Sequence, residues 1–381
     1  MTRVAICGVA RTPIGKFRGS LSNLSAVDLG IRAVKELLHR CNIDPETGII
    51  DELLFGQVLQ AGAGQAPARQ VALGAGLPNT IAATTINKVC GSSLKAVMMA
   101  ANSIRAGQTQ VVIAGGMESM TNAPKFEKRN GDEKEMVSTM VHDGLWDVYN
   151  DLHMGNTGEI IANECNISRE EMDSFAARSQ HLASQAEQNG WFDWERFEMP
   201  ELNCDEGIRA NTTKEKLAEL APVFQEDGTV TAGNASTIND GASAVLLTSV
   251  DFAIDNGWEI IGIVEDYCTS GVEPSRVMYA PIPAIKTLLE RANLDVLDVE
   301  IYEHNEAFAS ASCAVAQELG IPHDRFNLHG GAVSLGHPLG SSGTRCLITM
   351  LGVMRRLDAK SGIVSLCLGG GNAVAMRVSI D

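Results

Sequence analysis

The sequence predicts an α/β protein built from two similar halves, with a segment inserted between them. Three observations support this prediction: an internal repeat, an alternation of helical stretches with short apolar runs, and a polar region that interrupts both. The apolar runs do not alternate with polar residues, so we expect sheets that are covered on both faces. We expect residues 1–118 with about 236–262 to form the first half, 119–235 the inserted loop domain, and 263–381 the second half.

The repeat is clearest in two stretches with the apolar spacing of a helix. Residues 33–44 and 284–295 are identical at seven of twelve positions, and each is followed by an acidic residue and a β-like run. Further along each copy, a Gly-Ser-Ser segment opens a predicted helix, at 91–93 and at 340–342. The same elements in the same order predict that helix N-termini lie at strand ends in both halves, where ligands usually bind.

The inserted region has a different composition. Ser168, followed by Glu171, is typical of a capping box, and it opens a long amphipathic helix. The basic residues of this region admit two interpretations, a solvated face or a cradle for phosphate groups, and the sequence favours neither. These residues are Lys125, Lys128, Arg129, Lys134, Arg209, Lys214 and Lys216.

Composition excludes several classes of protein. The chain has 381 residues, 45% of them hydrophobic, so it can bury a large core. Its net charge of -17 argues against binding to nucleic acids or anionic membranes, and no apolar run reaches the roughly 18 residues of a membrane span. Nine cysteines without a CxxC pair argue against a disulfide framework or zinc site. With no signal-peptide pattern, we expect a cytoplasmic protein without a metal.

Cys90 is the first candidate for chemistry. It follows a β-like run, 81–89, and precedes the predicted helix. A thiol at a helix N-terminus feels the positive end of the helix dipole, so we expect its pKa to fall and its thiolate to act as a nucleophile. The alternative is a buried structural cysteine.

Three further candidates lie in the second half. His337 stands on a glycine-rich loop before Pro338, as a general base or as a turn histidine that bonds the backbone. Cys367 ends a predicted strand before three glycines, which suits an oxyanion site or a core cysteine. Asn305 to Phe308 is expected to start a helix, where the amide either positions a water or carbonyl or only caps the helix. A joint site with Cys90 would lie where the halves meet.

Together these segments resemble the thiolase family. The matching segments run in family order over nearly the whole chain: 87–93, 115–120, 153–155, 231–236, 305–308, 336–338 and 367–371. The resemblance implies a duplicated five-layer αβαβα fold, with a loop domain that holds coenzyme A and that contributes oligomer contacts. Family members are commonly homodimers or homotetramers, and the resemblance makes 122–134 a tetramer contact.

The resemblance also implies an acyltransferase that condenses two acetyl-CoA reversibly to acetoacetyl-CoA and CoA. Cys90 would take the acyl group while His337 accepts its proton, and Cys367 would remove an α-proton from the second acetyl-CoA. His337 and a water held by Asn305 would stabilise the enolate oxygen. The backbone amides of Cys90 and Gly369 would stabilise the tetrahedral intermediate.

The resemblance assigns coenzyme A to a set of apolar and polar positions, with Arg209 at the nucleotide end. These positions are Leu145, His153, Met154, Arg209, Phe224, Ala232, Ser236, Ala307 and Phe308. Coenzyme A thioesters are the substrates, and no separate cofactor or metal is expected.

Three positions depart from the usual pattern of the family: the segment 277–281, which is one residue shorter and carries Tyr279, together with His329 and Ala373. They leave the acyl chain length open.

The alternative functions are a degradative 3-ketoacyl-CoA thiolase of broader chain length and a non-catalytic acyl-CoA-binding protein. A decarboxylating ketoacyl synthase would carry two histidines and no second cysteine, so Cys367 argues against it.

Overall fold

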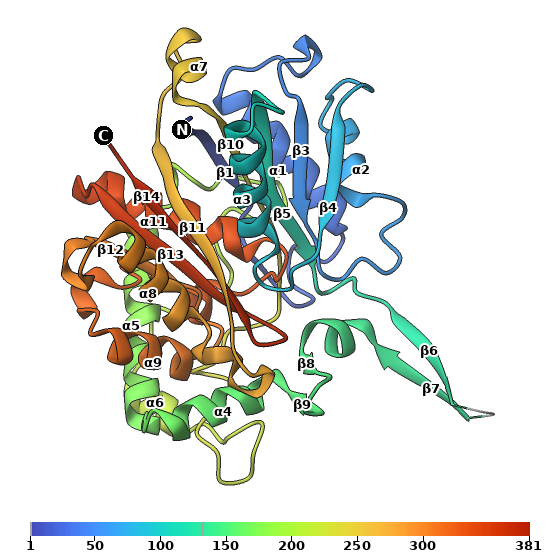
Figure 1. The fold of residues 1–381 in the computed structure, drawn as a ribbon. Helices are drawn as coiled ribbons and strands as arrows, with labels where there is room; N and C mark the ends of the chain where they lie inside the picture. The colour runs from blue at the N-terminus through green and yellow to red at the C-terminus, as the bar shows by residue number, and fades with distance from the viewer. Residues whose placement is uncertain (1, 131–132) are drawn as a thin grey trace.

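The structure is a computed structural model that describes residues 2–130 and 133–381. Two α/β halves lie against each other (Figure 1): the first runs from blue to teal along residues 4–119 and returns in yellow with β10 and α7, and the second runs from yellow-orange to red. The first half comprises β1 (Val4–Arg11), β2 (Gly15–Lys16), α1 (Ala26–Arg40), β3 (Glu52–Gly56), α2 (Pro67–Gly74), β4 (Ala82–Ile86), α3 (Ser92–Arg105), β5 (Val111–Ser119), β10 (Asn239–Ser249) and α7 (Val250–Asp255). The second comprises β11 (Gly262–Gly271), α8 (Pro281–Ala292), β12 (Ile301–His304), α9 (Ala309–Leu319), α10 (Ala332–Leu335), α11 (Ser342–Leu357), β13 (Ser361–Leu368) and β14 (Asn372–Ser379).

The two halves share one strand arrangement, which confirms the repeat. In the first half β3 pairs in parallel with β5, β5 pairs antiparallel with β10, and β10 pairs antiparallel with β1. In the second half β12, β13, β14 and β11 pair in the same way and in the same order. The repeated helical stretches fall in α1 and α8. Each half is therefore a copy of one α/β unit.

Helices and strands stack in five layers. One core packs α1 and α2 on the strands of the first half, and another packs α8 and α9 on those of the second. Between them, α3 and α11 share a single core with strands of both halves. The five-layer fold is thus confirmed, but the halves also meet directly, because β1 pairs with β11 over three residues and makes one continuous ten-stranded sheet.

The N-termini of α3 and α11 approach closely because glycines line their contact. A Cβ on Gly116 would lie 1.9 Å from the carbonyl oxygen of Gly340, and one on Gly343 would lie 2.5 Å from the backbone nitrogen of Leu94. Ser93 Oγ accepts a hydrogen bond of 2.9 Å from the backbone N–H of Thr344. Each half therefore brings the start of one helix to the same place.

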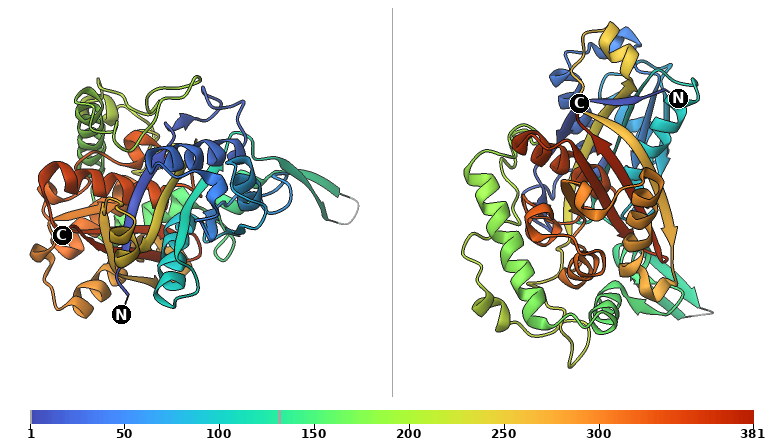
Figure 2. Two further views of the ribbon diagram at one scale, coloured as in Figure 1. Left: turned by 90° about the horizontal axis from the view of Figure 1, so that it is seen from above. Right: turned by 60° about the vertical axis from the view of Figure 1, so that its left-hand side comes forward.

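The segment between β5 and β10 covers the lower side of the second half (Figure 1). It contains β6 (Lys125–Asn130), β7 (Glu133–Ser138), β8 (Trp146–Asp147), β9 (Leu152–His153), α4 (Met154–Glu164), α5 (Arg169–Gln188) and α6 (Lys214–Ala218). The predicted capping box at Ser168 starts α5, which runs beside the second half (Figure 2, right). The β6–β7 hairpin projects away from the molecule, and its Arg129 and Lys134 pair with Glu127 on the exposed surface. Nothing in the described chain is a helix long and apolar enough to cross a membrane.

His329, one of the departures from the family pattern, lies in an aromatic stack beside the last turn of α11. Its ring lies 5.2 Å from that of Trp191, and Arg356 Nε donates a hydrogen bond of 3.0 Å to His329 Nε2. The acceptor role of Nε2 places the ring proton on Nδ1. Burial and the charge of Arg356 lower the pKa of His329 to about 3, so the native state holds this ring neutral.

Replacing His329 by glutamine should make the protein less sensitive to acid. Because the pKa of His329 is lower in the folded than in the unfolded chain, its stabilising contribution is complete above about pH 6.5 and is lost as the pH falls towards 3. In urea unfolding, the wild type should have a higher free energy of unfolding than His329→Gln at pH 7.5. This difference should be smaller at pH 4.5. His181→Gln, at an exposed position of α5, is the control. If the difference in free energy of unfolding is the same at both pH values, the lowered pKa of His329 is contradicted.

Candidate active site

A small cavity lies where the two halves meet, with a volume of about 50 Å³. The predicted Cys90, His337, Cys367 and Gly369 all line it, so the structure brings residues of both halves together as expected. The remaining lining residues are Gly144, Leu145, Met154, Ser236, Val277, Met278, Ala307, Phe308, Leu339 and Leu368.

Cys90 stands in a tight turn before α3. The preceding strand ends at Ile86 rather than Val89, because Val89 has a φ of 46°, a left-handed conformation that a β-branched residue rarely adopts. Ser92 Oγ stabilises this turn by donating to the carbonyl of Val89 and accepting from the N–H of Lys88. The strained turn places the partly exposed Cys90 on the cavity wall.

The electrostatics of Cys90 differ from the prediction. Burial raises the pKa of its thiol to about 12, although the backbone N–H groups of Cys90 and Gly369 both donate towards the sulfur. The expected lowering by the helix dipole is therefore wrong: in this cavity the cost of desolvating a thiolate exceeds the benefit of the nearby donors. A thiol that is neutral at pH 7 needs a base at the moment of attack.

His337 has the protonation state of such a base. The Ser342 hydroxyl donates to the carbonyl of Pro338 at 2.9 Å, so it accepts from the His337 Nδ1–H at 2.6 Å. This leaves the lone pair on Nε2. Burial, together with the charge of Arg345, lowers the pKa of His337 to about 3, which keeps the ring neutral near pH 7. A neutral imidazole with a free Nε2 can accept the proton of a thiol.

Asn305 lies beside this base but not in a helix. Its Nδ2 is 3.4 Å from His337 Nε2, and its Oδ1 lies 3.8 Å from the donor Cys346 Sγ. The prediction that Asn305 to Phe308 starts a helix is wrong: α9 begins at Ala309, with Phe308 as its N-cap. The backbone N–H of Asn305 instead donates to the carbonyl of Ser365, which extends the ladder between β12 and β13. Asn305 therefore lies behind His337 and does not itself line the small cavity.

Cys367 is buried at the end of β13, paired with Ala373 of β14. Burial and the nearness of Cys90 raise the pKa of its thiol. Its sulfur lies 3.5 Å from Met278 Sδ, so the segment 277–281 closes this side of the cavity through Val277 and Met278. Tyr279 does not line the cavity.

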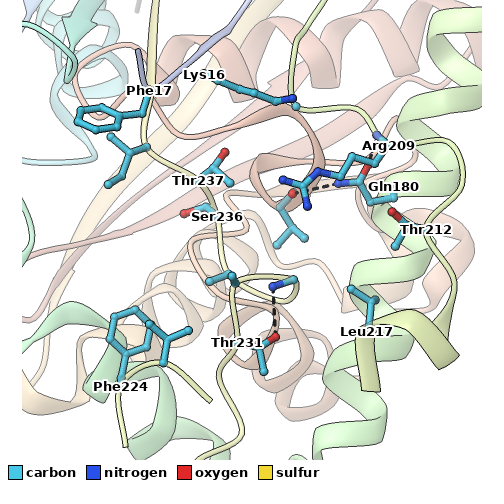
Figure 3. Close-up of a pocket in the computed structure, with 17 residues that line it drawn as sticks. Lys16, Phe17, Gln180, Arg209, Thr212, Leu217, Phe224, Thr231, Ser236 and Thr237 are labelled. Carbon is cyan, nitrogen blue, oxygen red and sulfur yellow. Dashed lines mark hydrogen bonds between the residues drawn. The ribbon is translucent and has the colours of Figure 1, made fainter. Parts of the chain in front are cut away.

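A second, larger cavity of about 400 Å³ shares Ser236 with the first. Lys16 and Arg209 extend over it from opposite sides (Figure 3), and among the described residues no acidic side chain lines it. This neutral-to-basic lining suits an anionic ligand despite the net charge of -17. Its other predicted members are Phe224 and Ala232. Of the basic residues of the insertion, Arg209 alone lines this cavity.

His153 supports the wall between the cavities without lining either. Its ring stacks on Phe224 at 4.8 Å, and Phe224 meets Phe308 edge-on at 6.2 Å. His153 Nδ1 caps α4 by accepting from the N–H of Gly155. A Cβ on Gly155 would lie 2.3 Å from the Phe224 ring, which explains the glycine.

Four residues that the sequence interpretation passed over belong to this region. Met278 closes the small cavity beside Cys367, and Lys16 supplies a cation from the first half to the larger one. Ser342 and Glu118 support the loop of His337. The Gly-Ser-Ser pattern predicts only a helix start at Ser342. Its position five residues after a candidate base was the signal that could have identified it.

Replacing Ser342 by alanine should lower turnover about tenfold or more, because the Nδ1–H of His337 loses its acceptor and the reactive tautomer is no longer fixed. Steady-state kinetics of the reaction proposed below would show a fall in kcat with little change in KM. Ser341→Ala is the matched control, since Ser341 Oγ contacts Ser243 and not the histidine. Equal losses in both variants would refute this role of Ser342.

Comparisons with known proteins agree over the whole chain. The family model for the thiolase N-terminal domain matches residues 4–251, and that for the thiolase C-terminal domain matches 258–380. An acetyl-CoA acetyltransferase of Cupriavidus necator is 45% identical over 99% of both chains. A probable acetyl-CoA acyltransferase of Staphylococcus aureus is 44% identical over 100% of this chain and 99% of its own. The crystal structure of the thiolase Acat5 from Ascaris suum, in complex with coenzyme A, superposes with a TM-score of 0.94 at 38% identity, covering 99% of each chain.

Proposed function

Because the chain belongs to the thiolase family, we propose that it is an acetyl-CoA C-acetyltransferase, which condenses two acetyl-CoA reversibly to acetoacetyl-CoA and CoA. The observation that carries the proposal is the small cavity in which Cys90, Cys367 and a neutral His337 meet. Two thiols and one base on a single cavity suit an acyl transfer followed by a proton abstraction from carbon.

In the first step Cys90 Sγ attacks the thioester carbonyl while its proton passes to His337 Nε2. The bond between the acyl carbon and the sulfur of coenzyme A breaks, and the departing thiolate takes that proton. The backbone N–H groups of Cys90 and Gly369, which point at the Cys90 sulfur, lie beside the carbonyl oxygen of an acyl group on that sulfur. One such donor is typically worth about 3 kcal/mol in the transition state.

In the second step the thiol proton of Cys367 passes to His337 Nε2, and the Cys367 thiolate removes an α-proton from a second acetyl-CoA. The resulting carbanion attacks the carbonyl of acetyl-Cys90, and the Cys90 sulfur leaves and takes the proton from His337 Nε2. A thioester α-carbon is a weak acid, so the enolate oxygen needs donors in place before the proton departs. Asn305 and His337, 3.4 Å apart, supply a donor pair there, with Asn305 acting through a bound water.

Coenzyme A would occupy the larger cavity, with its pantetheine arm passing Ser236 to reach Cys90. Leu145, Met154, Ala307 and Phe308 would line the arm near the reacting sulfur. Arg209 would meet the phosphates, with Lys16 on the opposite rim. The substrates are coenzyme A thioesters, and the proposal includes no separate cofactor.

The proposal extends to the organisation of the chain. We keep the division into 1–118 with 236–262, 119–235 and 263–381, with the insertion binding coenzyme A. A cytoplasmic location is supported by nine cysteines that are all unpaired in the structure. A homodimer or homotetramer is part of the proposal, with the projecting β6–β7 hairpin as a contact.

A degradative thiolase of broader chain length is the alternative, in keeping with the acyltransferase name of the Staphylococcus relative. The position of Met278 favours the short chain, because its sulfur lies 3.5 Å from that of Cys367 and closes the cavity on this side. A non-catalytic binding protein would not need the two thiols and the base together.

Chain-length selectivity tests the proposal. In thiolysis, acetoacetyl-CoA should have a kcat/KM at least about tenfold above that of 3-ketohexanoyl-CoA, since each misfit methylene costs about 1–3 kcal/mol. Met278→Ala should lower the ratio of these two kcat/KM values, because it enlarges the cavity beside Cys367. Tyr279→Phe, whose ring packs against Arg276, is the control.

A higher kcat/KM for the six-carbon substrate would overturn the short-chain assignment in favour of the broader thiolase. No turnover of either substrate, together with binding of coenzyme A, would favour the non-catalytic protein.

A further inference from the structure

We propose that Glu118 and Asn239 are positioning residues that hold the loop of the general base, residues 336–340, at its two ends. The inference rests on the proposed function, because it concerns the placement of His337 as a base. Both residues belong to the first half, whereas the loop belongs to the second. The base would therefore be fixed by the half that carries the nucleophile.

Glu118 holds the far end of the loop. Its Oε2 accepts from the backbone N–H of Gly340 at 2.9 Å and of Val58 at 3.0 Å, and its Oε1 accepts from that of Leu59 at 3.1 Å. Val58 and Leu59 pack in one apolar cluster with Leu339, and Cys90 borders that cluster. A single carboxylate thus joins three backbone groups around the wall of the cavity.

Asn239 holds the near end. Its Oδ1 accepts from the backbone N–H of His337 at 3.0 Å, and its Nδ2 donates to the carbonyl of Gly15 at 2.9 Å. The adjacent Gly336 has a φ of 111°, and a Cβ there would lie 2.3 Å from the Asn239 side chain. The glycine before the base is therefore explained by the close approach of this amide.

In the part of the chain that the structure describes, Glu118 is a buried acid without a cationic partner, which indicates a role other than packing. Glu118 is completely buried, and among the described residues no lysine or arginine forms an ion pair with it. Burying an unpaired carboxylate is costly, and three N–H donors recover only part of that cost. Burial raises its pKa to about 7. Both oxygens of a carboxylate accept hydrogen bonds, so Glu118 can bind the N–H groups of Gly340 and Val58 with one oxygen and that of Leu59 with the other. A glutamine has only one acceptor oxygen, and its NH2 group would face an N–H donor.

The position of the loop matters because His337 must reach the thiol of Cys90. A misplacement of about 1 Å in a catalytic group can cost on the order of a hundredfold in rate. The coenzyme A cavity does not include Glu118 or Asn239, so their loss should affect turnover rather than substrate binding.

The test compares three variants of the full-length enzyme. Glu118→Gln replaces one of the two acceptor oxygens of Glu118 by an NH2 group. Asn239→Ala removes the hydrogen bond from the backbone N–H of His337 to Asn239 Oδ1 at the other end of the loop. Asp240→Asn is the matched control: Asp240 is also a buried acid, next to Asn239, but it bonds Ser119 and Thr121 rather than the loop. Thiolysis of acetoacetyl-CoA gives kcat and KM, and hydrogen exchange by mass spectrometry follows a peptide that spans 336–340.

We expect kcat to fall about 10- to 100-fold in Glu118→Gln and Asn239→Ala, with KM within about twofold of wild type. Exchange in the 336–340 peptide should become faster in both variants, and Asp240→Asn should resemble the wild type in every measurement. If Glu118→Gln does not fold, Asn239→Ala still carries the test.

Unchanged loop exchange in the two variants, an equal loss of kcat in Asp240→Asn, or a rise in KM at constant kcat would each overturn the inference. The exchange measurement keeps this inference distinct from the proposed function. If the wild type does not turn over acetoacetyl-CoA, the function fails, while faster exchange would still support the loop clamp.

Discussion

The close approach of α3 and α11, one from each half, is the constraint on which the site depends. Gly343 of α11 lies against the backbone of Leu94 in α3, and Gly340, just before α11, lies against Gly116 of β5. None of these glycines has room for a Cβ, so the start of α11 approaches α3 and β5 to a distance that side chains would prevent. The candidate nucleophile Cys90 lies two residues before α3, and the candidate base His337 lies five residues before α11. Duplication alone would give two separate strand ends, and this packing makes them one cavity.

Burial then sets the chemistry of that cavity. It makes Cys90 a weaker acid and His337 a weaker base than either would be in water, so the resting site is an uncharged thiol beside an uncharged imidazole. Such a pair avoids the cost of buried charges until a substrate arrives. The N–H groups of Cys90 and Gly369 donate towards the Cys90 sulfur, and in the proposed reaction they would also face the negative charge that develops during acyl transfer.

Much of this arrangement could be predicted from the sequence, because motifs and repeats report local structure. The repeat gave the duplicated order of strands and helices, and the helix starts at Ser92 and Ser342 followed from their Gly-Ser-Ser segments. Properties that depend on distant contacts could not be predicted. The pKa of Cys90 depends on desolvation, which the helix dipole argument left out.

The direct pairing of β1 with β11 and the hydrogen bond from Gly340 to Glu118 likewise join residues far apart in the chain.

The most direct test of the whole account is to trap the acyl group. Cys367→Ala enzyme mixed with acetyl-CoA, quenched in acid and mapped by mass spectrometry should carry one acetyl group, on Cys90, and should form no acetoacetyl-CoA. Acetyl found on another residue, or an unmodified Cys90 in enzyme that binds coenzyme A, would contradict it.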